Sequence, residues 1–190
     1  MIAIIDYGAG NANSVKNALD YLGYDSLITS EPEKILEADK VIFPGVGSFG
    51  DAMKELKKRK LDRAIKEYIG SKKPFLGICI GLQVLFEQSE ESPNAKGLGV
   101  FKGKVVKFKK GKIPQIGWNK IESEKIGDGY AYFVNSYYAI PDDKKIIESA
   151  SDYHGKFTAA VKKDNVFASQ FHLEKSGKFG LGILKEWLEC

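Results

Sequence analysis

Histidine and cysteine are scarce in this chain of 190 residues, with two of each. Cys79 and Cys190 lie far apart and lack the spacing of a metal site or a disulfide framework. A reducing compartment is therefore indicated, and we expect no metal and no other cofactor. Chemistry that needs an imidazole has only two candidates, His154 and His172.

Long apolar runs are absent as well, and the charges nearly balance. No stretch approaches the roughly 20 residues that span a membrane, and residues 2–5 begin a strand rather than a signal peptide. We therefore expect a cytoplasmic protein without a membrane partner. Lys and Arg exceed Asp and Glu by 29 to 25, which is too little to indicate nucleic acid. The lysine-rich segment 102–112 and the basic run 57–60 are interpreted as solvated faces.

The length fits a single domain over residues 1–190. Apolar runs and helical spacing alternate along the first half. They predict strands at 1–6, 27–28, 41–43 and 74–78, and helices at 14–22, at 53–69 with a break near Lys60, and from Cys79 through Glu87. This alternation favours an α/β fold with a parallel sheet covered by helices on both faces.

The second half changes character, because its apolar runs are short and separated by turn signals. We expect strands at 105–108, 130–134, 157–161 and 166–170, added in antiparallel fashion to the edge of the sheet. A last helix is predicted at 180–188.

Residues 74–81, PFLGICIG, carry the strongest chemical signal. A strand enters, Cys79 sits in a turn between two glycines, and a helix leaves, as in a nucleophile elbow with a thiol in place of a hydroxyl. Such a turn exposes the nucleophile at the carboxyl end of the sheet, and a helix N-terminus favours the thiolate. The alternative is a buried structural cysteine. The flanking glycines and the strand-to-helix context favour a functional role.

His172 and Glu174 supply the groups that a thiol nucleophile needs. In an extended segment, residues i and i+2 point to the same side, so both can face Cys79. A cysteine paired with a histidine that a carboxylate orients is the arrangement of acyl-transfer enzymes. A zinc site is the alternative, but no second Cys or His lies nearby in sequence. His154 is interpreted as a surface or core residue.

A carboxamide or ester substrate would also need an oxyanion hole. The PGVG segment at 44–47 follows a parallel strand and should reach the same edge of the sheet as Cys79. Its glycines leave backbone N–H groups accessible, and one of them could act with the N–H of Ile80. The alternative is an ordinary turn after a strand.

Together these motifs resemble the class I, triad-type glutamine amidotransferases, and most closely the glutaminase subunits of imidazole glycerol phosphate synthase. The resemblance covers nearly the whole chain. Its motifs, in family order, are IIDYGAGN at 4–11, FPGVGSF at 43–49, GICIGLQ at 77–83, GWN at 117–119, YFV at 132–134 and QFH at 170–172.

The resemblance implies a flavodoxin-like sheet, with Cys79 as nucleophile, His172 as general base and acid, and Glu174 as the carboxylate that orients His172. It implies a glutamine site formed by six residues: Gly47, Ile80, Gln83, Glu91, Ser136 and Tyr137. It also implies a (β/α)₈-barrel cyclase subunit as partner, which receives the ammonia for histidine biosynthesis.

Three positions depart from the family pattern. Gln115 stands where the family usually has His, Asn135 replaces the His after Tyr-Phe-Val, and Leu173 replaces a Pro. The motifs involved are expected to flank the partner, so these departures suggest a different or modified synthase.

Other functions are compatible with parts of the sequence. One is a paralogous glutaminase that feeds another synthase, for example in amidino-sugar formation. A stress or deglycase-type protein and a non-catalytic binding subunit are further alternatives, disfavoured by Glu174 and by the intact triad. A dinucleotide fingerprint beginning GAG at 8–10 fails, because its third glycine falls at Asn13.

Overall fold

The computed structural model describes residues 1–9 and 11–190. Gly10, which belongs to the motif at 4–11 and to the rejected dinucleotide fingerprint, lies outside the described residues. A nine-stranded sheet in the order β2-β1-β3-β4-β12-β11-β10-β7-β8 forms the centre of the molecule. A three-stranded sheet, β5-β6-β9, lies beside it.

Five neighbouring strands of the large sheet are parallel, in the order β2-β1-β3-β4-β12. They are β1 (Ile2–Ile5), β2 (Ser26–Thr29), β3 (Lys40–Gly45), β4 (Phe75–Cys79) and β12 (Val166–Ser169). This order is flavodoxin-like, which confirms the predicted fold class. The strands β1, β4 and β12 are buried throughout, as strands covered on both faces must be.

The sheet continues with four antiparallel strands. These are β7 (Gln115–Glu122), β8 (Gly129–Asn135), β10 (Ile147–Asp152) and β11 (Lys156–Lys163). The prediction of added antiparallel strands is thus confirmed for two expected segments, 130–134 and 157–161. Strands β7 and β10 were not predicted, because polar residues interrupt their apolar residues.

Two segments of the second half were placed wrongly by the sequence. Residues 166–170 were expected at an antiparallel edge, but β12 pairs in parallel with β4 and lies inside the sheet. Its run VFAS is buried on both faces and lacks the alternation of an edge strand. Segment 105–108 belongs to β6 (Gly103–Lys107), which pairs with β5 (Gln88–Ser89) and β9 (Tyr137–Pro141) in the small sheet. The small sheet packs against the large one, since β9 contacts both β11 and the helix after Cys79.

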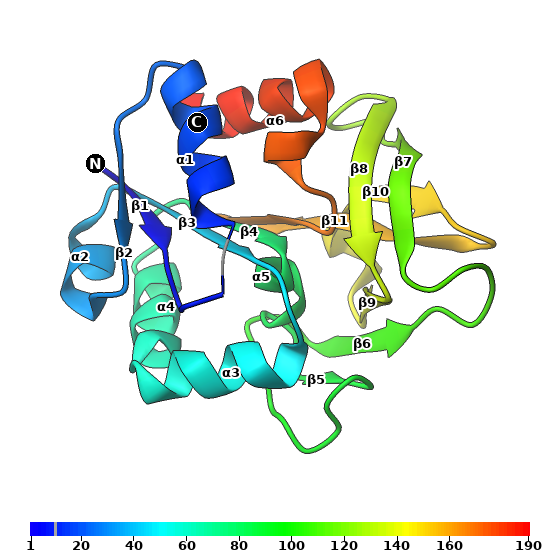
Figure 1. Ribbon diagram of the computed structural model, residues 1–190, viewed down its shortest axis with the longest axis horizontal. Coiled ribbons are helices and arrows are strands. Elements are labelled where there is room, and N and C mark those ends of the chain that lie inside the picture. Colours follow the sequence, from blue (N-terminus) through cyan, green and yellow to red (C-terminus); the bar gives the residue numbers. More distant parts are fainter. Residues whose placement is uncertain (10) are drawn as a thin grey trace.

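Helices cover both faces of the large sheet (Figure 1). On one face lie α1 (Ala12–Tyr21) and α6 (Gly177–Glu189), and on the other lie α2 (Pro32–Glu37), α3 (Phe49–Lys58), α4 (Leu61–Gly70) and α5 (Ile80–Gln83). Short 3₁₀ turns occur at η1 (Lys144–Ile146) and η2 (Leu173–Lys175). The predicted break near Lys60 is confirmed, since Lys60 has a left-handed backbone with φ 61°.

The helix after Cys79 ends earlier than predicted, at Gln83 instead of Glu87. The next four carbonyls accept hydrogen bonds from the loop 97–101, for example Val84 from the N–H of Leu98 at 2.7 Å and Leu85 from Phe101 at 3.0 Å. The N–H groups of Leu85 and Phe86 donate only three residues back, to Leu82 at 3.2 Å and Gln83 at 3.1 Å, so the α-helical pattern ends here. Through these hydrogen bonds the loop 97–101, which leads into β6 of the small sheet, is attached to the segment after α5.

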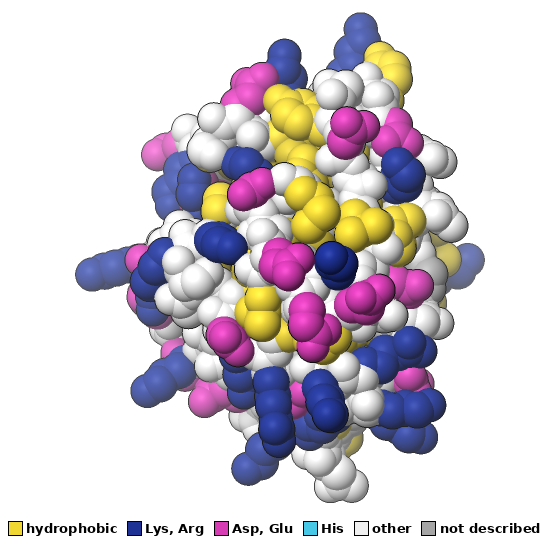
Figure 2. Space-filling model, turned by 90° about the vertical axis from the view of Figure 1, so that its left-hand side faces the viewer, with side chains coloured by type: hydrophobic (Ala, Val, Ile, Leu, Met, Phe, Trp, Pro, Cys, Tyr) yellow, Lys and Arg dark blue, Asp and Glu magenta, His cyan; other side chains and the backbone are white. Residues whose placement is uncertain are grey.

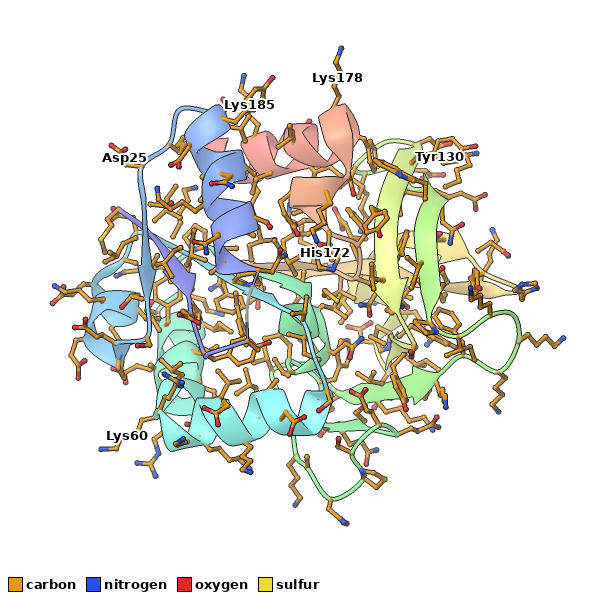
Figure 3. All side chains as sticks on the ribbon, viewed as in Figure 1. Asp25, Lys60, Tyr130, His172, Lys178 and Lys185 are labelled. Carbon is orange, nitrogen blue, oxygen red and sulfur yellow. The ribbon has the colours of Figure 1, made fainter. Side chains whose placement is uncertain are left out.

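The surface beside β2 and α2 is charged, with hydrophobic side chains between the charges (Figure 2). Basic side chains gather over the lower part of this face, where α3 and α4 lie in Figure 1. Lys60, from the basic run 57–60, lies at the lower left in Figure 3. Within residues 1–9 and 11–190, no helix combines the length and the apolar character needed to cross a bilayer.

Candidate active site

Cys79 ends β4 in a strained turn, with φ 56° and ψ −105°. Side chains rarely adopt this conformation. The glycines on either side are required by packing: a Cβ at Gly77 would lie 2.7 Å from the carbonyl oxygen of Gly81, and one at Gly81 would lie 2.0 Å from that of Phe43. The small–x–Cys–x–small pattern therefore has the physical cause that the sequence suggested.

His172 and Glu174 form a buried pair next to this turn. The Nδ1 of His172 lies 2.8 Å from Oε1 of Glu174, and the side chains are 2% and 0% exposed. The predicted extended geometry is wrong, because Glu174 belongs to the 3₁₀ turn η2 that begins directly after His172. The turn still brings the carboxylate onto the ring. Figure 3 shows His172 near the centre of the molecule, to the right of the lower end of α1 and below the start of α6.

Asn11, which precedes α1, completes the pair. Its Nδ2 donates to Oε1 of Glu174 at 2.6 Å and lies 3.4 Å from Nδ1 of His172. The sequence analysis did not include Asn11 among the site residues, although it belongs to the motif at 4–11. With Nδ1 engaged by Glu174, Nε2 of His172 is the ring nitrogen left for the thiol.

The protonation of the pair follows from competing effects. Burial lowers the pKa of His172, but hydrogen bonds with Cys79 and Glu174 outweigh it and raise this pKa to about 10. Burial raises the pKa of Glu174, but its contacts with His172 and Asn11 leave the pKa below the usual value. An imidazolium beside a carboxylate is therefore the stable form at neutral pH.

The Cys79 sulfur has contacts on its other side as well. Gln170 donates from Nε2 to Sγ at 3.6 Å, and the carbonyl oxygen of Val134 lies 4.0 Å from Sγ. Gln170 is fully buried. Its position two residues before His172 was the only sign of this contact in the sequence.

A cavity of about 300 Å³ opens over the sulfur. Its lining brings together eight of the nine predicted site residues, while Glu174 lies behind His172. The eight are Gly47, Cys79, Ile80, Gln83, Glu91, Ser136, Tyr137 and His172. The lining also includes Val46, Pro114, Val134, Asn135 and Lys175, which were not among the predicted site residues.

Two polar residues of the lining have defined roles in its shape. The amide of Gln83 donates both to the carbonyl of Tyr137 at 3.1 Å and to Oε1 of Gln170 at 3.0 Å. Only its oxygen is thus left to accept from a molecule in the cavity. Glu91 accepts from the N–H of Phe49 at 2.6 Å, which holds its carboxylate at the rim of the cavity.

The PGVG segment reaches the same edge of the sheet, where Gly45 pairs with Cys79. The buried hydroxyl of Tyr7 donates to the carbonyl of Val46 at 2.9 Å. This hydrogen bond fixes the orientation of the peptide between Val46 and Gly47. Gly47 has φ +103°, a conformation that favours glycine. Burial, and then the proximity of Cys79, raise the pKa of Tyr7, so its hydroxyl remains a donor.

The three departures from the family pattern have buried side chains, although Gln115 and Asn135 lie on the strands that also carry the exposed Ile116 and Val134. Gln115, Asn135 and Leu173 are only 1%, 5% and 0% exposed. Gln115 and Asn135 are cross-strand neighbours, and Nε2 of Gln115 donates to Oδ1 of Asn135 at 2.8 Å. Leu173 packs in the core beneath α6. Two of the departures therefore form one buried hydrogen-bonded pair.

Among residues 1–9 and 11–190, no three His, Cys, Asp or Glu side chains form a group that could hold a metal ion. His154 lies far along the chain from the elbow and is exposed in a turn with φ 55°. Its ring contacts Tyr153 at a centroid distance of 5.1 Å.

Comparison with known proteins places this arrangement in a family context. Residues 3–188 match the family model described as glutamine amidotransferase class-I. The chain is 46% identical, over its full length, to imidazole glycerol phosphate synthase subunit HisH 1 of Methanococcus maripaludis, covering 99% of that protein. It is 48% identical to subunit HisH of Caldanaerobacter subterraneus, with both chains covered completely. A crystal structure of a glutamine amidotransferase superimposes with a TM-score of 0.83 at 18% identity, covering 100% of this chain and 98% of the other.

Proposed function

The chain belongs to the class-I glutamine amidotransferases, and on that premise we propose that it hydrolyses glutamine to glutamate and ammonia with Cys79, His172 and Glu174. The observation that carries the proposal is that Cys79 and His172 both line the 300 Å³ cavity, with Glu174 behind His172 and 2.8 Å from its Nδ1. A cavity of this size admits an amino acid with its carboxamide at the sulfur.

In the proposed reaction each of the three groups has its own step. The Cys79 sulfur attacks the carboxamide carbon, and His172 gives a proton to the departing nitrogen, so that ammonia leaves and a thioester remains. Water then attacks the thioester, with neutral His172 taking its proton, and glutamate departs as the thiol is restored. Glu174 stabilises the imidazolium and fixes the ring, as its 2.8 Å contact with Nδ1 allows.

The glutamine itself would be held by the other lining residues. Glu91 offers a carboxylate for the α-ammonium group, and Gln83 offers its one free oxygen as an acceptor. Ser136 and Tyr137 also line the cavity and would contact the bound glutamine. The N–H groups of Gly47 and Ile80 are the candidates for the oxyanion hole, where a single donor is typically worth about 10²–10³ in rate.

Substitution of the nucleophile tests the proposal. Cys79→Ala should abolish glutamine hydrolysis, while the complex with its synthase should still use added ammonium salts. Cys190→Ala is the matched control, since this exposed cysteine lies at the end of α6. Glutaminase activity retained in Cys79→Ala would refute the assignment of the nucleophile.

We further propose that the partner is a (β/α)₈-barrel cyclase subunit that uses the ammonia to form imidazole glycerol phosphate. Ammonia must be kept from water, where it would become ammonium, which is not a nucleophile. The cavity has an apolar rim suited to being covered: Val46 and Val134 are 40% and 37% exposed, and Ile116 and Trp118 on the neighbouring strand are 63% and 54% exposed. The names of the close relatives support the same partner.

Docking of this partner would also complete the oxyanion hole. The peptide between Val46 and Gly47 is held by Tyr7 in the isolated chain, and a partner on the rim could change its orientation. We expect slow turnover for the chain alone and much faster turnover with the liganded cyclase. Equal rates in both states would remove this part of the proposal.

Complementation decides which synthase is served. A histidine auxotroph without its glutaminase subunit should grow when this chain and its cognate barrel are supplied together. Failure to grow, despite glutaminase activity of the purified pair, would favour a paralogue that serves another synthase.

A further inference from the structure

Side-chain amides form a continuous hydrogen-bonded chain from β7 to the Cys79 sulfur, which we call the amide chain. Its members are Asn119, Gln115, Asn135, Gln83 and Gln170, with the carbonyl of Tyr137 in the middle. The last four amides are buried, with exposures of 5% or less. Such a run of uncharged polar groups in the interior needs an explanation.

The first arm of the amide chain runs across the β7–β8 pair to the carbonyl of Tyr137. Asn119 donates to Gln115 at 2.6 Å, Gln115 donates to Asn135 at 2.8 Å, and Asn135 donates to the carbonyl at 2.9 Å. The second arm starts from the same carbonyl, which also accepts from Gln83 at 3.1 Å.

The second arm ends on the reactive sulfur. Gln83 donates its other amide hydrogen to Oε1 of Gln170 at 3.0 Å, and Nε2 of Gln170 then donates to Sγ of Cys79 at 3.6 Å. Gln170 is 0% exposed, so water does not compete for its amide hydrogens.

The direction of every bond in this arm is fixed by the backbone. A carbonyl can only accept, so Gln83 must turn its NH₂ toward Tyr137. Its second hydrogen faces Gln170, whose oxygen must therefore accept and whose NH₂ must face Cys79. An isolated glutamine beside a sulfur could flip to present its oxygen, whereas this one is held with its donor on the sulfur.

We propose that Gln170 is a hydrogen-bond donor that stabilises the Cys79 thiolate, and that Gln83 positions it by fixing the polarity of its amide. An N–H donor binds a thiolate more strongly than a neutral thiol, and the low dielectric of the interior increases the difference. The consequence for glutamine turnover rests on the proposed function. The effect on the sulfur does not.

Alkylation of the thiols by iodoacetamide tests the proposal without glutamine. Cys79 and Cys190 are both free, so exposed Cys190 is an internal reference for mass spectrometry of each variant. Gln170→Leu should slow alkylation of Cys79 at neutral pH about tenfold relative to Cys190, and should move the curve of rate against pH about one unit higher. Gln170→Glu, which places a carboxylate near the sulfur, should slow it at least as much.

The sign of the change separates this role from a structural one. Cys79 is only 7% exposed, so mere loosening of the site would speed its alkylation. Gln83→Leu should slow alkylation severalfold, since Gln170 loses its orientation. Gln115→Leu, in the first arm, should leave the rate within twofold, because the carbonyl of Tyr137 still anchors the second arm.

The remaining titratable groups around the sulfur are the same in all these variants. They are Tyr7, Glu91, Tyr137, His172, Glu174 and Lys175. An unchanged or faster rate at Cys79 in both Gln170 variants would overturn the proposal. Glutaminase activity retained in Cys79→Ala would instead refute the proposed function and leave the alkylation result intact. If both hold, Gln170→Leu should lower kcat with little change in KM.

Discussion

The Cys79 sulfur lies between two polar regions that are both buried and yet differ in kind. On one side the His172–Glu174 pair is ionised and can gain or lose a proton. On the other side, the amide chain is neutral across the whole pH range and ends in Gln170. Protonation can change on the first side only, whereas the second can hold a fixed donor at every pH.

The two sides are also stabilised differently. The ion pair offsets its desolvation through a 2.8 Å contact and the added donor of Asn11. The amides satisfy one another and one backbone carbonyl, so little desolvation is left uncompensated. A site built this way can change the charge of its base while the groups around the sulfur keep their arrangement.

The largest expected effect comes from removing the ionisable side. His172→Ala eliminates the proton donor and acceptor, and turnover of glutamine should fall by roughly 10²–10⁴. Steady-state glutaminase assays of the complex measure this directly. Substitution of the exposed His154 by Ala is the control and should leave turnover unchanged. A mild loss in His172→Ala would mean that some other group transfers the proton.

A smaller effect is expected when the charged side is made neutral like the amide side. Glu174→Gln keeps the shape but removes the charge, and should lower turnover by about tenfold to a hundredfold, the value of one charged hydrogen bond. It should also lower the pKa of His172, so the alkaline limb of the rate profile moves to lower pH. If the alkaline limb of the rate profile stays at the same pH, Glu174 does not act through the imidazolium of His172.

The same variant changes stability in a defined pH window. Since the pKa of His172 is raised from 6.5 to about 10 on folding, its contribution is complete below pH 6.5 and is lost as the pH rises through about 10. Melting temperatures should show this loss in the wild type and a smaller loss in Glu174→Gln.

The smallest effect is expected in the first arm of the amide chain. Gln115→Leu and Asn135→Leu each leave a buried amide without its partner and should cost about 1–3 kcal/mol of the free energy of unfolding. The double variant should cost less than the sum, because the two residues bond each other at 2.8 Å. Urea denaturation measures all three. Strict additivity would mean that the pair contributes no coupling.

The parallel half of the fold and the elbow could be predicted because their signals are local. The run into Cys79 and its two glycines report a backbone geometry that few other residues permit. The break near Lys60 was also predicted, and Lys60 has a left-handed backbone between α3 and α4. His172 and Glu174 were identified correctly as neighbours, but through an extended geometry that the 3₁₀ turn replaces.

The remaining features depend on contacts between distant segments. The carbonyls of residues 84–87, just after the helix, accept hydrogen bonds from residues 97–101, a contact that no local pattern reveals. Asn11 meets Glu174 across 163 residues, and Gln170 meets Cys79 across 91. The pairing of Gln115 with Asn135 was not predicted, because nothing in one strand reveals which residue lies opposite it across the sheet.

The two ends of the chain are held by adjacent residues at the start of β3. The amino group of Met1 forms an ion pair with Asp39, and Lys40 donates to the carbonyl of Cys190 at 2.6 Å. Both ends thus lie at the amino edge of the parallel strands, whereas Cys79 lies at the carboxyl edge. An affinity tag, a fluorophore or a fused protein attached at either end would leave from the side away from the cavity. Labelled versions for binding measurements can therefore be made without obstructing the mouth of the site.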